Sequence, residues 1–255
     1  MSQAPAVELR EASCRTGERI RLHPTSLRIE RGSITGVIGR NGSGKSTMLG
    51  LMSSEIRPTS GAVLINGDDA ESLSLTERAR RRAVLTQDTS VSFPFSVRDV
   101  VSWGRTPWQR TPSAANDEAV IDEAIASQDL TALVDRPVTS LSGGERKRVH
   151  IARVLAQQSH VLLLDEADAD LDLVGRRVVD DLVVEHCGRG DTAIVVSHDI
   201  SRLARFCTQF ILVREGRVHR MGTAAEVLTE ADLSEAFGAS VAVTGEGDSL
   251  TVHIP

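Results

Sequence analysis

A glycine-rich stretch near residue 40 carries the residue types that bind phosphate. It reads G-R-N-G-S-G-K-S-T and fits the pattern G-x-x-x-x-G-K-[ST], whose glycines let backbone N–H groups approach phosphate oxygens. Lys45 is expected to reach the β- and γ-phosphates of a nucleotide, and the Ser46 hydroxyl to coordinate Mg²⁺. The alternative is a glycine-rich turn without a ligand. The candidate phosphate-binding residues are Gly39, Arg40, Asn41, Gly42, Ser43, Gly44, Lys45, Ser46 and Thr47.

Two carboxylates follow an apolar run at residues 161–164. Asp165 is placed where a carboxylate would hold Mg²⁺, directly or through water. Glu166 comes next, and a second carboxylate beside the γ-phosphate can orient and polarise the attacking water. Alone, this pair could equally cap a helix. Together with the phosphate-binding stretch it predicts a catalytic site for phosphate hydrolysis.

Two further polar residues follow predicted strands. Gln87 could hydrogen-bond a water molecule or serve as a Mg²⁺ ligand, and His198 could donate to the γ-phosphate. The alternatives are a polar surface residue and a structural histidine. The order of these residues along the chain favours the catalytic interpretation.

The predicted elements place these side chains at one edge of a sheet. Residues 33–38, 161–164 and 192–196 read as buried strands, and residues 45–54 and 174–187 as helices. Strands that alternate with helices predict an α/β core with a mostly parallel sheet, which binds its ligand at the carboxyl ends of the strands. Antiparallel strands are expected at 7–9 and 20–29, another strand at 62–65, a short helix at 74–82, a strand at 83–86, helical stretches at 114–127 and 129–134, and a hairpin at 209–213 and 217–220.

Two clusters of side chains allow more than one interpretation. Four of the seven aromatic residues fall in one stretch; they form either an interaction surface or the core of a small helical subdomain. They are Phe93, Phe95, Trp103 and Trp108. The arginines at 78, 80, 81 and 82 form either a docking patch or a solvated face.

Composition limits the functions that this chain can have. The 255 residues carry a net charge of −6, so the composition does not indicate the excess of basic residues that is typical of nucleic-acid-binding proteins. The three cysteines are scattered and show no metal-binding spacing, which indicates a reducing compartment. No signal peptide is visible, and no apolar run approaches the ~20 residues of a membrane span. We therefore expect a soluble protein whose membrane role, if any, requires a partner.

The motifs and their order resemble the ATPase subunit of ATP-binding-cassette (ABC) transporters over essentially the whole chain. The matching stretches are G-R-N-G-S-G-K-S-T (39–47), Gln87, L-S-G-G-E (141–145), L-L-L-D-E (162–166), A-D-L-D (169–172) and S-H (197–198). The resemblance implies a single domain over residues 1–255 with a P-loop (RecA-like) core, an N-terminal antiparallel β subdomain and a helical subdomain inserted at about 88–155. It implies ATP hydrolysis with Mg²⁺, where Ser46, Gln87 and Asp165 hold the metal and Lys45, Gln87, Glu166 and His198 are catalytic.

The L-S-G-G-E motif implies a partner. In the resembled family it binds the γ-phosphate of ATP held by a second copy of the subunit. Ser142 and the backbone N–H groups of Gly143 and Gly144, at a predicted helix start that includes Glu145, form an anion site that suits this role. The implied partners are a second copy, a transmembrane permease dimer and, indirectly, a substrate-binding protein. The permease would hold this protein at the cytoplasmic face of the membrane.

A finer resemblance points to importers of metal chelates. Residues 80–87, 91–108 and 222–238 are similar to ATPases that import haem, ferric siderophores or cobalamin, most of all to those for haem. In that group the stretch after Gln87 docks the permease. A non-transport ABC ATPase and a nucleotide-binding regulator without turnover are the competing hypotheses.

The chain departs from the family pattern at two places. Thr16 stands at the position of the usual adenine-stacking ring, so Arg15 or Arg19 is expected to stack on the base instead, with weaker base discrimination. Ala167 and Asp168 replace the usual Pro-Thr pair. The added carboxylates of Asp168 and Asp170 are expected to raise the negative charge beside the site.

Overall fold

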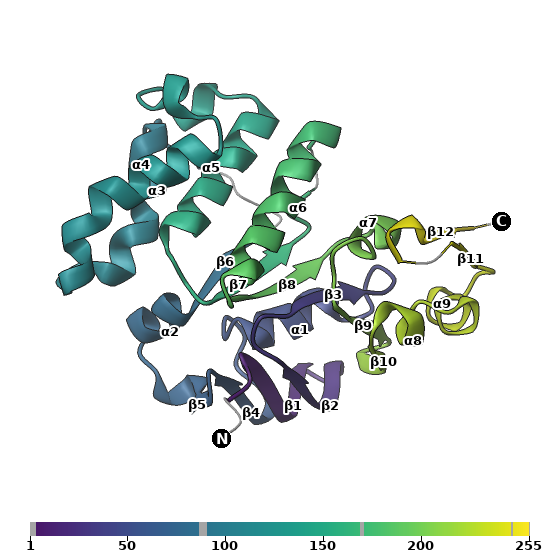
Figure 1. Ribbon diagram of the computed structural model, residues 1–255. Helices are drawn as coiled ribbons and strands as arrows, with labels where there is room; N and C mark the ends of the chain where they lie inside the picture. Colours follow the sequence, from purple (N-terminus) through teal and green to yellow (C-terminus); the bar gives the residue numbers. More distant parts are fainter. Residues whose placement is uncertain (1–3, 87–90, 169–170, 246, 255) are drawn as a thin grey trace.

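Two large sheets, a two-stranded sheet near the C-terminus and a separate group of helices form the protein in the computed structural model (Figure 1). The structure describes residues 4–86, 91–168, 171–245 and 247–254. The central sheet has the order β10-β9-β3-β8-β7-β6, in which only β10 runs antiparallel to its neighbour. The predicted α/β class with a mostly parallel sheet is therefore confirmed. The strands of this sheet are β3 (Ile34–Ile38), β6 (Arg82–Leu85), β7 (Val161–Asp165), β8 (Thr192–Val196), β9 (Gln209–Arg214) and β10 (Arg217–Gly222).

The second sheet is antiparallel and lies at the bottom of Figure 1, as predicted for the N-terminal part of the chain. Its strands, in the order β2-β1-β4-β5, are β1 (Val7–Thr16), β2 (Arg19–Ile29), β4 (Ser60–Ile65) and β5 (Asp68–Asp69). Strand β1 is longer than the predicted 7–9, because a bulge around Glu11, whose φ is 47°, interrupts the period-2 alternation that marks a strand. The alternation of apolar and polar residues therefore predicted only the first part of β1.

Helix α1 (Lys45–Met52) packs between the two sheets. Its Met48, Leu51 and Met52 are fully buried against apolar side chains from both sheets, so they anchor the end of the glycine-rich loop. Helix α6 (Leu173–Gly188) covers the opposite face of the central sheet. The chain then continues through α7 (Ile200–Leu203), α8 (Ala224–Val227), α9 (Glu230–Phe237), β11 (Ala242–Thr244) and β12 (Thr251–His253).

A group of helices stands to one side of the sheets and has a core of its own (Figure 1). It contains α3 (Val97–Ser102), α4 (Asp117–Ser127) and α5 (Gly143–Ala156), and α2 (Leu75–Arg81) precedes it. The helical stretch predicted at 129–134 is shorter than expected: it is a single 3₁₀ turn, Thr131–Leu133, because Asp129 at φ 53° is not helical. Among the described residues, no helix combines the length and the apolar character that a bilayer span requires.

The four arginines near α2 do not form a solvated face, because each is half-buried and hydrogen-bonded within the chain. The docking patch stays a prediction. Arg80 donates to the carbonyl oxygen of Pro107 over 2.7 Å, and Arg81 donates to the Asp68 carboxylate over 2.6 Å. The guanidinium groups of the other two also reach backbone carbonyls, Arg78 at Leu73 and Ser54 and Arg82 at Ser53. These half-buried side chains connect α2 and β6 to the rest of the fold.

The four clustered aromatic residues divide into one half-buried ring and three exposed rings, and none belongs to the apolar core of the helices. The interaction surface stays a prediction. Trp108 donates its indole N–H to the carbonyl oxygen of Gln157 over 2.7 Å and packs against the helices. Phe93, Phe95 and Trp103 form an exposed row of edge-to-face rings with centroids 6.2 and 5.1 Å apart. Phe93 is 68% exposed. We call these three rings the aromatic row.

Candidate functional site

The glycine-rich loop connects β3 to α1 at the carboxyl end of the central sheet. Two of its glycines are required by the fold. Gly39 has φ 145°, and a Cβ there would lie 2.2 Å from the carbonyl oxygen of Val213. Gly44, at φ 110°, caps the start of α1. The loop therefore presents backbone N–H groups and a helix N-terminus to whatever anion lies over it.

Lys45 lies under this loop with only 6% of its surface exposed. Its ammonium group donates to the carbonyl oxygens of Gly39 over 2.9 Å and Arg40 over 3.1 Å. Burial lowers the pKa of Lys45, although the nearby carboxylates of Glu166 and Asp165 oppose that shift. A cation held by neutral carbonyls in a buried position can exchange them for phosphate oxygens.

Ser46 and Asp165 form a site with the chemistry that Mg²⁺ prefers. Burial raises the pKa of Asp165, the repulsion of Glu166 raises it further, and a hydrogen bond from the Ser46 side chain lowers it. The Oδ1 atom of Asp165 is buried and has no hydrogen-bond partner among the described residues. A hydroxyl beside a carboxylate that keeps one oxygen without a partner fits a hard divalent cation with oxygen ligands.

Glu166 and His198 meet at the ends of β7 and β8. The Nε2 atom of His198 lies 2.6 Å from the Oε1 atom of Glu166, and the two side chains are 50% and 20% exposed. Glu166 adopts a left-handed backbone conformation, φ 49°, and its N–H donates to the carbonyl oxygen of Val196 over 3.0 Å. Such strained conformations cluster at functional sites. The pair can bind a water molecule and exchange its proton.

One cavity of about 590 Å³ brings the phosphate-binding loop and the Glu–His pair together. It extends to the N-terminal sheet, where it meets Arg19 but not Arg15. Sequence reasoning missed the part of the wall formed by the turn between β9 and β10, whose Gly216 donates to the Ser43 carbonyl over 2.7 Å. The lining residues that were not singled out are Ile20, Arg21, Glu215 and Gly216.

The L-S-G-G-E motif does not line this cavity. Ser142 caps α5, and its backbone N–H and hydroxyl both donate to Glu145, over 2.8 and 2.7 Å. A Cβ added at Gly143 or Gly144 would meet no atom of the chain within 4 Å. The fold itself therefore does not require glycine at these two positions.

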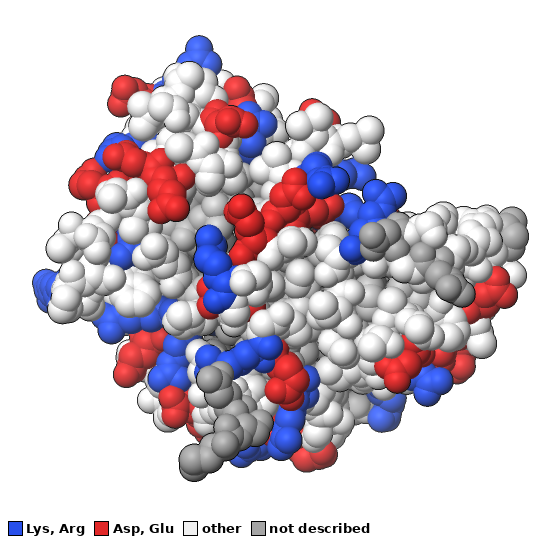
Figure 2. All heavy atoms as spheres, in the orientation of Figure 1, with Lys and Arg blue, Asp and Glu red and all other residues white. Residues whose placement is uncertain are grey.

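Gln87 and Asp170 lie outside the described residues. Asp168 is described, and the negative charge expected of it is offset only in part, since its partner is shared with Asp180. Arg202 forms an ion pair with it, and both side chains are nearly buried. Figure 2 shows acidic and basic side chains interspersed over the face in view, with a short acidic band at its centre bordered by basic groups.

A buried lysine under a glycine-rich loop, a carboxylate at the end of another strand of the same sheet and a Glu–His pair over one cavity define a P-loop nucleotide-binding protein. The model of the ABC transporter family matches residues 22–169, and the chain belongs to this family. The chain is 44% identical over 228 residues to the cobalamin import ATP-binding protein BtuD of Halobacterium salinarum, covering 89% of this chain and 57% of that protein.

A second relative is matched over more of its length. The chain is 40% identical over 227 residues to the hemin import ATP-binding protein HmuV of Streptomyces coelicolor, covering 89% of this chain and 81% of that protein. Among solved structures, it resembles the dimeric post-hydrolysis state of the ATP-binding cassette MJ0796 bound to ADP and Pi. The TM-score is 0.75 at 27% identity, covering 85% of this chain and 98% of that one.

Proposed function

We propose that this protein hydrolyses ATP to drive import through a separate membrane permease. One observation carries the proposal: the phosphate-binding loop, Ser46 and the Glu166–His198 pair all line one cavity. The names of the relatives, which are import ATP-binding proteins, agree with this function. The phosphates would lie over the loop, in contact with its N–H groups and with the ammonium group of Lys45.

In this proposal Glu166 orients the water that attacks the γ-phosphate. Its carboxylate accepts a hydrogen bond from that water, and His198 donates from the opposite side to the phosphate oxygen or to Glu166. Ser46 and Asp165 would hold Mg²⁺, which neutralises charge on the phosphates when bound. Gln87 would serve as a further ligand or water-binding group. Lys45 stabilises the charge that develops as the bond to the γ-phosphate breaks.

Each nucleotide site would be completed by a second copy of the chain. Ser142, Gly143 and Gly144 form a helix start with exposed donors, and they lie away from this chain's own cavity. Because the fold leaves open space beside both glycines, their lack of side chains is explained by a group that approaches from outside. We propose that this group is the γ-phosphate of ATP held by the partner copy, with Glu145 keeping Ser142 oriented. The resulting dimer would contain two such sites.

The cargo and the permease surface follow from the relatives and from one exposed feature. We propose haem or another metal chelate, such as a siderophore or cobalamin, as the cargo. The aromatic row lies on the inserted helical subdomain, about residues 88–155, and offers apolar surface of the kind that interfaces bury. A permease would dock there, placing the protein at the cytoplasmic face of the membrane. A substrate-binding protein would act on the far side.

The test is hydrolysis by the purified protein and its Glu166→Gln variant. This substitution keeps the shape and the hydrogen-bonding reach of the side chain but removes the carboxylate that polarises water. We expect ATP binding to persist while phosphate release falls by a factor of about 100 or more. Hydrolysis by the variant at the wild-type rate would overturn the proposed role of Glu166. If neither protein hydrolysed ATP, the result would instead support a nucleotide-binding regulator without turnover.

A further inference from the structure

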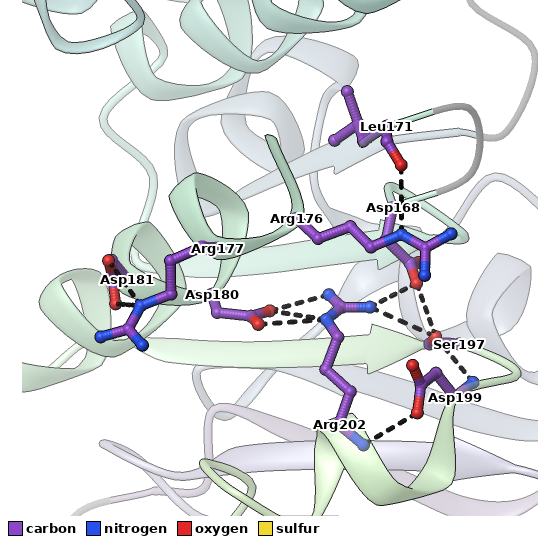
Figure 3. A network of polar contacts seen from close by, with 9 residues as sticks. All are labelled: Asp168, Leu171, Arg176, Arg177, Asp180, Asp181, Ser197, Asp199 and Arg202. Atoms are coloured by element: carbon purple, nitrogen blue, oxygen red, sulfur yellow. Dashed lines mark hydrogen bonds and ion pairs between the residues drawn. The ribbon is translucent and has the colours of Figure 1, made fainter. Parts of the chain in front are cut away.

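A buried charged cluster connects the segment that carries Glu166 to the segment that carries His198 (Figure 3). At its centre is Arg202 of α7, whose side chain is 8% exposed. Arg202 donates to the carboxylate of Asp168 and, through Nε, to both oxygens of Asp180 on α6, over 2.9 and 3.1 Å.

Each end of the cluster lies next to a proposed catalytic residue. Asp168 follows Glu166 by two residues, and Ser197 directly precedes His198. The Ser197 hydroxyl donates to Oδ2 of Asp168 over 2.9 Å, which connects the two segments directly. These contacts hold the two segments across the ends of neighbouring strands.

The turn around His198 is fixed on its other side as well. The backbone N–H of Asp199 donates to the Ser197 hydroxyl over 3.1 Å, and the backbone N–H of Arg202 donates to Asp199 over 2.9 Å. Arg202 thus contributes its backbone to the turn and its side chain to Asp168. One residue of α7 is therefore bound to both segments.

Close packing does not fix these segments by itself. A second cavity of about 590 Å³ borders Glu166, Asp168, Ser197 and His198, so one side of the pair faces open space. A buried cluster of one arginine and two carboxylates is also a costly way to stabilise a fold, because apolar residues of the same volume often do as well. Unlike apolar packing, its directed hydrogen bonds fix the orientation of the segments that they join.

We propose that Asp168 and Arg202 are positioning residues that hold Glu166 and His198 at hydrogen-bonding distance for hydrolysis. This inference rests on the proposed roles of Glu166 and His198. A displacement of reacting groups by about 1 Å is enough to slow catalysis by a factor of about 100. The cluster acts through the pair and need not touch the nucleotide.

The experiment measures ATP hydrolysis and ATP affinity of Asp168 variants of the full chain. For Asp168→Ala we expect kcat to fall about 10- to 100-fold while KM and the Kd for ATP change less than about threefold. Asp168→Asn keeps an oxygen that accepts from Ser197 and Arg202, so it should retain most of the wild-type kcat. In a His198→Ala background, Asp168→Ala should cause little further loss, because the pair that it positions is already gone.

The matched control is the exposed ion pair between Arg177 and Asp181 on α6. Asp181 directly follows Asp180, but this pair has no hydrogen bond to the cluster (Figure 3). Asp181→Ala should leave kcat unchanged. If Asp168→Ala does not fold, Ser197→Ala tests the same connection through the loss of one hydrogen bond, with a smaller fall in kcat.

Two results would overturn the inference. One is a wild-type kcat for a folded Asp168→Ala or Ser197→Ala protein while Glu166→Gln is inactive. The other is a loss from Asp168→Ala that persists in full in the His198→Ala background. Wild-type hydrolysis by Glu166→Gln would instead refute the proposed roles of the pair, so the two failures are distinguishable.

Discussion

Replacing Gly144 with alanine should make the protein more stable and less active. Gly144 lies in the first turn of α5, where its backbone is helical and an added Cβ meets no atom within 4 Å. Gly→Ala in a helix stabilises by about 0.5–1 kcal/mol, which for a chain of this size raises Tm by about 1–4 °C. In the proposed dimer, however, the added methyl group would occupy the space between the N-terminus of α5 and the γ-phosphate of the ATP held by the partner copy, so activity should fall.

The assay pairs a thermal melt without nucleotide with steady-state ATP hydrolysis. We expect a fall in hydrolysis of at least about tenfold, because the methyl group displaces the phosphate from its hydrogen-bonding distance. Gly188→Ala is the matched control: Gly188 ends α6, it also has open space around its Cβ position, and it lies outside the proposed site. A Gly144→Ala protein that hydrolyses ATP at the wild-type rate would refute the reasoning.

Three further predictions concern the rest of the site. Arg19→Ala should weaken ATP binding in a nucleotide titration by up to about tenfold, and Arg15→Ala should not, because Arg19 lines the cavity and Arg15 does not. Equal effects of the two substitutions would contradict base stacking by Arg19. Ser46→Ala should abolish the Mg²⁺ dependence of tight ATP binding while leaving the fold intact, and an unchanged Mg²⁺ titration would exclude Ser46 as a ligand. Trp103→Ser should leave the ATPase activity of the isolated protein unchanged but prevent co-purification with the permease, and full retention of the complex would exclude the aromatic row as the docking surface.

The parts of the fold that local patterns determine could be predicted from the sequence. The glycine-rich stretch between an apolar strand and a helix predicted the β3–loop–α1 unit, because each feature lies within a few residues of the next. The central strands were evident as continuous apolar runs, since a parallel sheet is covered on both faces. The roles of the site residues, in contrast, remain predictions that the experiments above test.

What the sequence did not reveal depends on contacts between distant segments. Arg80 and Arg82 look like surface residues in the sequence, yet their hydrogen-bond acceptors are carbonyls 27 and 29 residues away. The same holds for Asp168, which pairs with Arg202, 34 residues further along the chain. Charge patterns report on neighbours in the chain and on helix faces, and neither includes these pairs.

The central claim is that two copies of this chain share each ATP, with the phosphate-binding loop from one copy and the α5 N-terminus from the other. The most direct test is the molar mass of the Glu166→Gln protein by light scattering with ATP and Mg²⁺. The account predicts a rise from the 27.5 kDa of one chain to about twice that value with ATP, reversal with ADP, and no rise when Gly144→Ala is added. A protein that binds ATP and remains at the mass of a single chain would contradict the account.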